Sequence, residues 1–211
     1  MKLVDLNVTA FLEKTASNEP VPGGGSISAL NAAIATALGT MVTNLTIGRK
    51  KYADKDAEMT AAAEKLNAMR TRFVELIDLD SEAYDQVFAA FKLPKETDEE
   101  KAHRAAVIEE ATKHAAEIPM EVARTAVEAM PTIIYIGENG NTNAITDSCV
   151  AIMCCRAAVR GAILNVRINL GGLKDEAYVE SMKAACEELE AMALVHENEL
   201  ITYAQENHGL C

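Results

Sequence analysis

The sequence contains no tryptophan, and phenylalanine and tyrosine bring the aromatic share to only 4% of 211 residues. No segment alternates apolar and polar side chains with the period of two that marks a half-buried strand. Ala, Leu, Met, Glu and Lys dominate instead, and these residues favour helices, whereas strands favour aromatic and β-branched side chains. We therefore predict an all-α fold, a single-domain bundle of long helices over residues 1–211, with no sheet.

Positive charge is also scarce, since 20 Lys and Arg face 32 Asp and Glu for a net charge of -12. Nucleic acids and anionic membranes both require a cationic surface, so we expect neither as a partner. No uninterrupted apolar run reaches the 18 or so residues of a membrane helix, and "MKLVDLNVTAF" lacks the apolar core of a signal peptide. These features predict a cytoplasmic protein.

Cysteine is infrequent, with five residues, an odd number whose spacing matches no zinc pattern. We expect buried free thiols. Glu100-x-x-His103 resembles half of a di-metal bundle site, but no second Glu-x-x-His occurs. The sequence therefore predicts neither a metal site nor a cofactor.

Glycine and proline divide the helical pattern into segments. Thr97 and Glu100 form a capping-box pattern that opens one helix, Pro119 is expected to start another, and Pro131 is expected to kink or end it. The remaining helices are expected at residues 5–17, from Ser26 or Ser28 to Gly48, and at 54–91, 143–170 and 175–207.

The stretch "EPVPGGGSISALNAA" places Gly23, Gly24 and Gly25 just before a helix. It matches neither G-x-G-x-x-G nor the P-loop, and no strand precedes it. Glycines let a backbone approach a ligand closely, and the free N–H groups of a helix start attract anions. A binding loop and a flexible helix start both remain open at this point.

The segment 143–170 has one face of small residues into which an acid and two amides project, because side chains recur there at helical steps. This face consists of Asp147, Ala151, Cys154, Ala158, Gly161, Asn165 and Asn169. Buried amides need partners from protein or ligand. Arg156, Arg160 and Arg167 fall on the opposite face, which is typical of a solvated surface or a subunit interface.

Two further groups of charges have open interpretations. Arg49, Lys50 and Lys51 follow a helix, where cations stabilise the C-terminus or can capture a carboxylate. Asp78 and Asp80 are two residues apart, so they do not share a helix face. Either can be solvent-exposed, or one can face a cleft where burial raises its pKa.

Six stretches together resemble the formiminotransferase-cyclodeaminase C-terminal domain family, in its order and spacing. They are "PVPGGGSISALNAA", "MVTNLTIGRKKY", "IDLDSEAY", "IPMEVA", "GNTNAITD" and "NVRINL". The family includes formiminotetrahydrofolate cyclodeaminases and stand-alone methenyltetrahydrofolate cyclohydrolases. Arg49 departs from an expected Lys, and Ser81 and Tyr84 replace the commoner Ala and Phe, which weakens the case for a role of Asp80.

The resemblance implies a homodimeric enzyme, a tetrahydrofolate substrate with or without additional glutamates, and no metal. The predicted activity is 5-formiminotetrahydrofolate cyclodeaminase, with methenyltetrahydrofolate cyclohydrolase as the alternative. A non-enzymatic helical scaffold is the third possibility. We predict Asp147, and after it Asp78, as the proton-moving acid. The predicted substrate-binding residues are Gly23, Gly24, Gly25, Ser26, Lys50, Lys51, Asn141, Asn165 and Asn169.

Overall fold

The computed structural model of the chain describes residues 2–209, and every regular element in that range is a helix. The all-α prediction is therefore confirmed. The α-helices are α1 (Val8–Thr15), α2 (Gly24–Thr46), α3 (Asp56–Phe91), α4 (Asp98–Asn139), α5 (Ile145–Leu170) and α6 (Glu176–His208). Three short 3-10 helices lie at Leu3–Asp5, Lys50–Lys55 and Thr142–Ala144.

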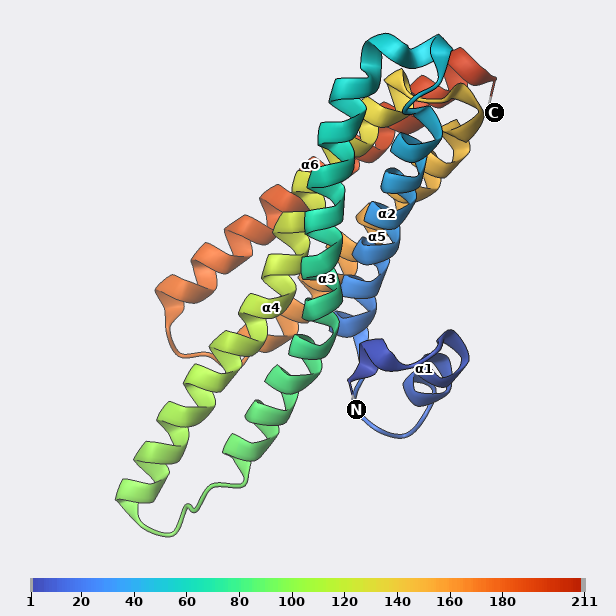
Figure 1. Cartoon of the computed structure of the whole chain (residues 1–211). Helices are drawn as coiled ribbons and strands as arrows, with labels where there is room; N and C mark the ends of the chain where they lie inside the picture. Colours follow the sequence, from blue (N-terminus) through green and yellow to red (C-terminus); the bar gives the residue numbers. More distant parts are fainter. Residues whose placement is uncertain (1, 210–211) are drawn as a thin grey trace.

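The helices α2, α3, α4 and α5 lie lengthwise beside one another in an elongated bundle, with α6 against α4 and α5 (Figure 1). The green α3–α4 hairpin projects beyond the other helices at one end, and α1 lies beside the start of α2. Fully buried Leu66, Phe73, Ile133 and Ile152 contribute to the core between the helices.

The helices α2 and α5 are apolar because they form the middle of the bundle. By length and composition alone, Gly24–Thr46 and Thr142–Leu170 would each be able to cross a membrane, although neither contains an uninterrupted apolar run of 18 residues. Their most apolar windows are 61% and 50% buried inside the bundle, as core helices require. The two helices run antiparallel, since Ser28 of α2 lies beside Gly161 of α5 while Leu45 meets Asn141 near the other end.

The helix α4 continues through both of its prolines, so the prediction that Pro119 starts a helix is wrong, and of the two outcomes expected at Pro131, a kink or an end, the helix does not end there. Pro119 is buried between Ile118 and Met120, and packing against neighbouring helices holds the segment helical. The ring removes one N–H, which leaves the carbonyl of Ala115 without its usual helical donor. The predicted capping box of Thr97 and Glu100 is confirmed.

The start of α2 differs from the prediction that Ser26 or Ser28 caps it. The helix begins at Gly24, and its N-cap residue is Gly23, which has no side chain to cap with. The hydroxyl of Ser28 donates to the carbonyl of Gly24 at 2.7 Å, inside the first turn. Ser26 instead faces α3, which brings the glycine stretch against that helix.

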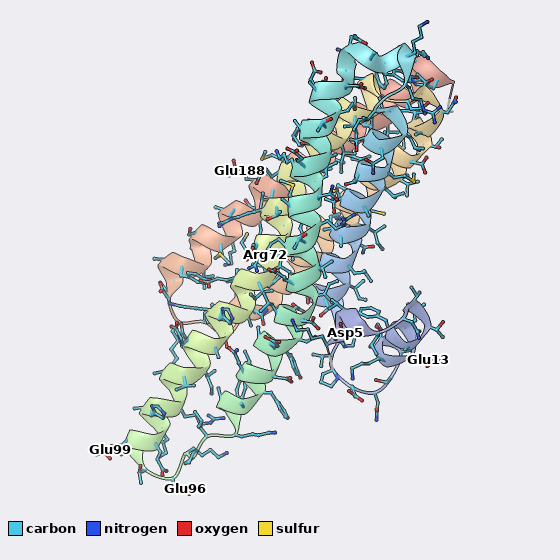
Figure 2. The ribbon with its side chains drawn as sticks, in the orientation of Figure 1. Asp5, Glu13, Arg72, Glu96, Glu99 and Glu188 are labelled. Carbon is cyan, nitrogen blue, oxygen red and sulfur yellow. The ribbon has the colours of Figure 1, made fainter. Side chains whose placement is uncertain are left out.

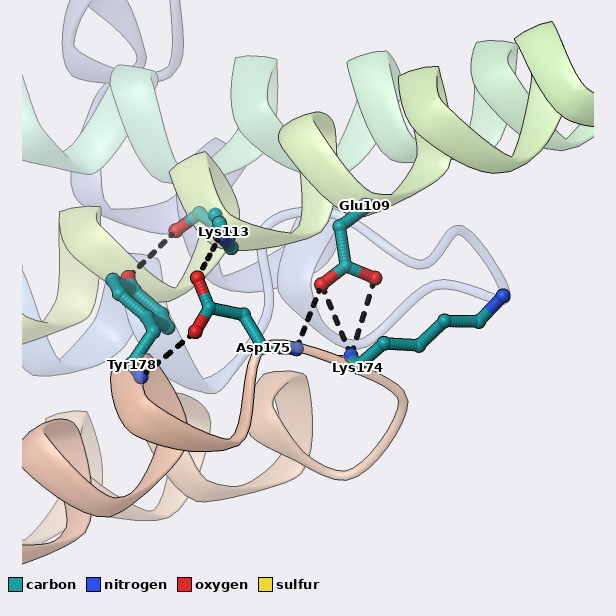
Figure 3. A network of polar contacts seen from close by, with 5 residues as sticks. All are labelled: Glu109, Lys113, Lys174, Asp175 and Tyr178. Atoms are coloured by element: carbon teal, nitrogen blue, oxygen red, sulfur yellow. Dashed lines mark hydrogen bonds and ion pairs between the residues drawn. The ribbon is translucent and has the colours of Figure 1, made fainter.

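Polar contacts fix the long helices relative to one another. Arg72, near the middle of the bundle in Figure 2, donates from Nε and Nη2 to both oxygens of Glu121, joining α3 to α4. At the start of α6, the Lys113 ammonium of α4 lies 2.6 Å from Asp175 (Figure 3). Glu109 accepts from the backbone N–H groups of Lys174 and Asp175, so the 171–175 loop is fastened to α4.

The cysteines follow the prediction where the structure describes them. Cys149, Cys155 and Cys186 are buried, Cys154 is half-buried, and all four are free thiols. Cys211 lies outside the described residues.

Candidate active site

Asp80 of α3 lies against Gly25 in the first turn of α2. The backbone N–H and the hydroxyl of Ser26 lie 2.8 and 3.0 Å from Oδ2 of Asp80. The carboxylate therefore caps α2 from a neighbouring helix, in place of the cap that Gly23 cannot supply. A Cβ at Gly25 would overlap this carboxylate, so the contact requires glycine at that position.

Asp80 has an unusual environment for an acid. Desolvation raises the pKa of its carboxyl, and the two donors of Ser26 offset only part of that effect. Among the described residues, Oδ1 has no hydrogen-bond donor, whereas Oδ2 has both. One oxygen is thus held in place while the other is free to exchange a proton with a ligand.

Two amides of α5 stand beside the glycine stretch. The side-chain Nδ2 of Asn165 donates to the carbonyl of Gly161 at 2.8 Å, and a Cβ at Gly24 would lie 2.9 Å from that nitrogen. The Nδ2 of Asn169 lies 2.9 Å from the Ala115 carbonyl and 3.0 Å from the Asn165 carbonyl. Both amide nitrogens are therefore used internally, which leaves both side-chain oxygens available as acceptors for a ligand.

These groups line one pocket of about 340 Å³, which is within the range of small-molecule sites. Its wall combines exposed glycine backbone, one acid, two amides and apolar side chains. The lining residues are Pro20, Val21, Gly23, Gly24, Gly25, Asp80, Tyr84, Val87, Ala115, Asn165, Ile168 and Asn169. Such a pocket can bind a flat polar heterocycle through the amide oxygens and move protons through Asp80.

Asp78 has a structural contact instead. Its side chain is buried, and Oδ1 accepts a 2.6 Å hydrogen bond from the backbone N–H of Leu3. This bond ties the N-terminal segment to α3, and Asp78 does not line the pocket that contains Asp80. The expectation that one of the two aspartates faces a cleft therefore holds for Asp80, whereas the sequence predicts Asp78 as the candidate acid.

Asp147 lies far from this pocket. It is half-buried in the first turn of α5 and precedes Asn165 by 18 residues of continuous helix, which is about 27 Å at 1.5 Å per residue. The side chains share a helix face as predicted, but grouping Asp147 with the glycine loop in one pocket is wrong within a single chain. Its role as an acid stays a prediction.

Lys50, Lys51 and Asn141 also lie at the far end. The lysines belong to the 3-10 helix after α2, whose 23 residues span about 34 Å. The Asn141 side chain donates to the Leu45 carbonyl, and its backbone N–H donates to the hydroxyl of Thr46. Nearby, the hydroxyl of Tyr52 lies 3.3 and 3.1 Å from the hydroxyl and N–H of Thr142, contacts that lower the pKa of Tyr52 to about 8.

The stretches "TIGRKKY" and "GNTNAITD" are thus joined in space, as a second polar cluster opposite the glycine pocket.

The three arginines of α5 belong to neither cluster. They face acids of α6, Arg156 with Glu197, and Arg160 and Arg167 with Glu190.

The comparisons with known proteins bear on this arrangement. The sequence model of the formiminotransferase-cyclodeaminase family matches residues 7–188. The chain belongs to this family. It is 42% identical over 186 residues to a methenyltetrahydrofolate cyclohydrolase of Methylorubrum extorquens, covering 88% of this chain and 89% of that protein.

Other members of the formiminotransferase-cyclodeaminase family match over the same region. The formimidoyltransferase-cyclodeaminase of Rattus norvegicus is 31% identical over 181 residues, which are 86% of this chain but 34% of that protein. The chain therefore matches about a third of the length of this relative. The crystal structure of a formiminotetrahydrofolate cyclodeaminase from Thermotoga maritima superposes with a TM-score of 0.85 at 29% identity, over 97% of each chain.

Asp80 lines the pocket but is not among the site residues predicted from the sequence. Tyr84, one helical turn further along α3, also lines the pocket. A sequence signal existed, because Asp80 recurs at helical steps with Phe73, Ile77 and Val87, on the side of α3 that packs inward.

Proposed function

We propose that the protein is a folate one-carbon enzyme whose reaction takes place beside Asp80, and that its activity is that of a 5,10-methenyltetrahydrofolate cyclohydrolase. The observation that carries the chemistry is the Asp80 carboxyl, which has a raised pKa and lies over Gly25 in a pocket that Asn165 and Asn169 also line. The cyclohydrolase assignment is supported by the 42% identity to a cyclohydrolase that the chain matches over nearly the whole length of both.

The pocket residues have distinct tasks in this proposal. The amide oxygens of Asn165 and Asn169 accept from the N–H groups of the pterin ring. Asp80 accepts a proton from water as the water oxygen bonds to the cationic carbon between N5 and N10. The C–N5 bond then breaks, N5 takes a proton, and the C–OH group becomes the formyl group on N10. Methenyl cation and water thus give the 10-formyl compound and one released proton.

The cyclodeaminase reaction is the second candidate, and the superposition on the Thermotoga cyclodeaminase supports it. There N10 attacks the formimino carbon on N5 and loses its proton, and ammonia leaves. The same carbon and the same acid are used, so Asp80 would protonate the departing nitrogen.

One comparison of substrates decides between the two activities. The purified protein is offered each compound, and loss of methenyl absorbance is compared with ammonia release from the formimino compound. We expect faster turnover of the methenyl compound. Faster ammonia release would reverse the assignment, and failure of both reactions would leave the helical scaffold as the function.

We also propose that the protein is a homodimer. Apolar side chains are exposed along one face of α2, at Ile34, Met41 and Leu45, and along α5, at Val150, Met153 and Leu164. The two helices are neighbours, so these side chains favour an apolar contact with a second copy.

An antiparallel pairing on a two-fold axis would also explain the split between the two polar clusters. It would place the Lys50, Lys51, Asn141 and Asp147 end of one subunit near the glycine pocket of the other. Analytical ultracentrifugation is the first test, and sedimentation as a monomer at micromolar concentration would contradict this proposal.

A further inference from the structure

A second pocket continues the one at Asp80 towards the α3–α4 hairpin. It has a volume of about 240 Å³ and is lined by Val87, Phe91, Ile108, Glu109, Thr112, Ile168, Asn169, Gly172 and Leu173. Val87, Ile168 and Asn169 line both pockets, so the two are adjacent compartments of one groove.

The two compartments differ in chemistry. The first contains glycine backbone and the Asp80 carboxyl, whereas the second adds the apolar side chains of Phe91, Ile108 and Leu173 beside the polar Glu109 and Thr112. Ile168, on the shared wall, is 78% exposed, and Phe91 is 53% exposed. Large apolar side chains left this open along one groove are suited to being covered by an apolar part of a ligand.

We infer that the second compartment is the subsite for the aminobenzoyl group of the folate, with Phe91 as an apolar wall against its ring. This inference rests on the proposed function. A reduced folate joins a polar pterin to a benzene ring through a short linker at N10, and the groove leads from the compartment of Asp80 to one that contains Phe91, Ile108 and Leu173. Asn169 lies at the junction, where the linker would pass.

Glu109, the acid in the second compartment, is compatible with this assignment. Glu109 already accepts from the backbone N–H groups of Lys174 and Asp175 (Figure 3). Lys174 follows the last lining residue, and the structure describes no ion pair for its side chain. A cation thus lies next in the chain to the rim, on the side where the glutamate of the substrate would emerge.

The test compares two exposed apolar side chains. Phe91→Ala removes the proposed wall, and Val195→Ala is the control, since Val195 is 62% exposed on α6 and lines neither compartment. We expect Phe91→Ala to raise KM for methenyltetrahydrofolate about five-fold, because an aromatic contact remote from the reacting carbon contributes to ground and transition states alike. Val195→Ala should leave KM unchanged.

Inhibition by a fragment of the substrate distinguishes binding in the first compartment from binding in the second. Tetrahydropterin with a methyl group in place of the aminobenzoylglutamate should inhibit the wild type and Phe91→Ala with the same Ki. A parallel rise in Ki and KM would overturn the inference, because Phe91 would then act on the pterin compartment.

A second variant adds bulk at the rim without disturbing the fold. A Cβ at Gly172 meets no atom within 4 Å, so Gly172→Leu should fold and raise KM as well. Unchanged KM in both Phe91→Ala and Gly172→Leu would refute the subsite. A wild type that neither converts nor binds folate would instead refute the proposed function.

Discussion

Pro119 and Asn169 are linked through one carbonyl oxygen. The proline has no N–H to donate to the Ala115 carbonyl four residues earlier, and Nδ2 of Asn169 takes that place at 2.9 Å. A residue in the middle of α4 therefore fixes the orientation of an amide that lines the pocket on α5. The side-chain oxygen of Asn169 takes no part in this hydrogen bond.

Replacing Pro119 should stabilise α4 and weaken substrate binding. Pro119→Ala restores an N–H that competes for the Ala115 carbonyl, so Asn169 loses a partner. We expect unfolding to become harder by up to about 3 kcal/mol, while KM rises several-fold. Urea unfolding and steady-state kinetics measure the two effects. Pro131→Ala is the control, since it lies 12 residues further along α4 and should stabilise without changing KM. Equal KM values for both variants would contradict the link.

Asp80 should contribute more to turnover than to folding. Asp80→Asn keeps the acceptor for Ser26 and removes the proton-transfer group, so we expect turnover to fall by at least about 10²-fold. Circular dichroism should show the helices intact. Asp78→Asn is a useful comparison. Asp78 accepts a hydrogen bond from the backbone N–H of Leu3, so its replacement should mainly affect stability. A near-normal rate in folded Asp80→Asn would remove Asp80 from the mechanism.

Stability should depend on pH through Asp80. The folded protein raises the pKa of this carboxyl above the value of about 3.9 in an unfolded chain, so the folded state holds the proton more tightly. The resulting stabilisation is present below about pH 4 and is lost as the pH rises through the folded pKa. Relative to wild type, Asp80→Asn should thus gain stability as the pH rises from 4 to 7. The exposed Asp85→Asn, on the same helix, should follow wild type in urea titrations.

The glycine at the contact should tolerate no side chain. Gly25→Ala forces a methyl group into the Asp80 carboxylate, so either α2 shifts or the acid turns away. We expect a loss of about 1–3 kcal/mol in unfolding free energy together with most of the activity. Gly171→Ala is the matched control, because its Cβ would meet only the Ile168 carbonyl, at an ordinary 3.6 Å. Thermal unfolding that is the same for both variants would show that the contact relaxes freely.

A shared site predicts complementation between two inactive proteins. If Asp147 acts in the partner's pocket, Asp80→Asn and Asp147→Asn homodimers should both be inactive. Mixed dimers refolded from equal amounts should regain about a quarter of wild-type activity, because half of the dimers are mixed and each then has one intact site. An active Asp147→Asn homodimer would exclude Asp147 from the reaction.

Local patterns predicted the helices well and the site only in part. The periodicity of residues 54–91 and the capping box at Thr97 depend on neighbours in the chain, so α3 and the start of α4 follow from sequence. The continuation of α4 through Pro119 depends on tertiary packing, which propensity does not contain.

The different surroundings of the two aspartates could not be predicted for a similar reason. Asp78 and Asp80 differ in role only because one meets the backbone of Leu3 and the other meets Gly25, from segments more than 50 residues away. The 27 Å between Asp147 and Asn165 was implied by the helix length, whereas helical periodicity reported only their shared face.

Four cysteine thiols, three buried and one half-buried, can report on how the folded protein opens. Burial raises the pKa of Cys149, Cys154, Cys155 and Cys186, so each thiol resists alkylation while the helices around it stay closed. Cys149, Cys154 and Cys155 report on α5, and Cys186 reports on α6. The order in which a thiol reagent modifies them would therefore show whether α6 detaches before the central pair of helices separates, without any engineered label.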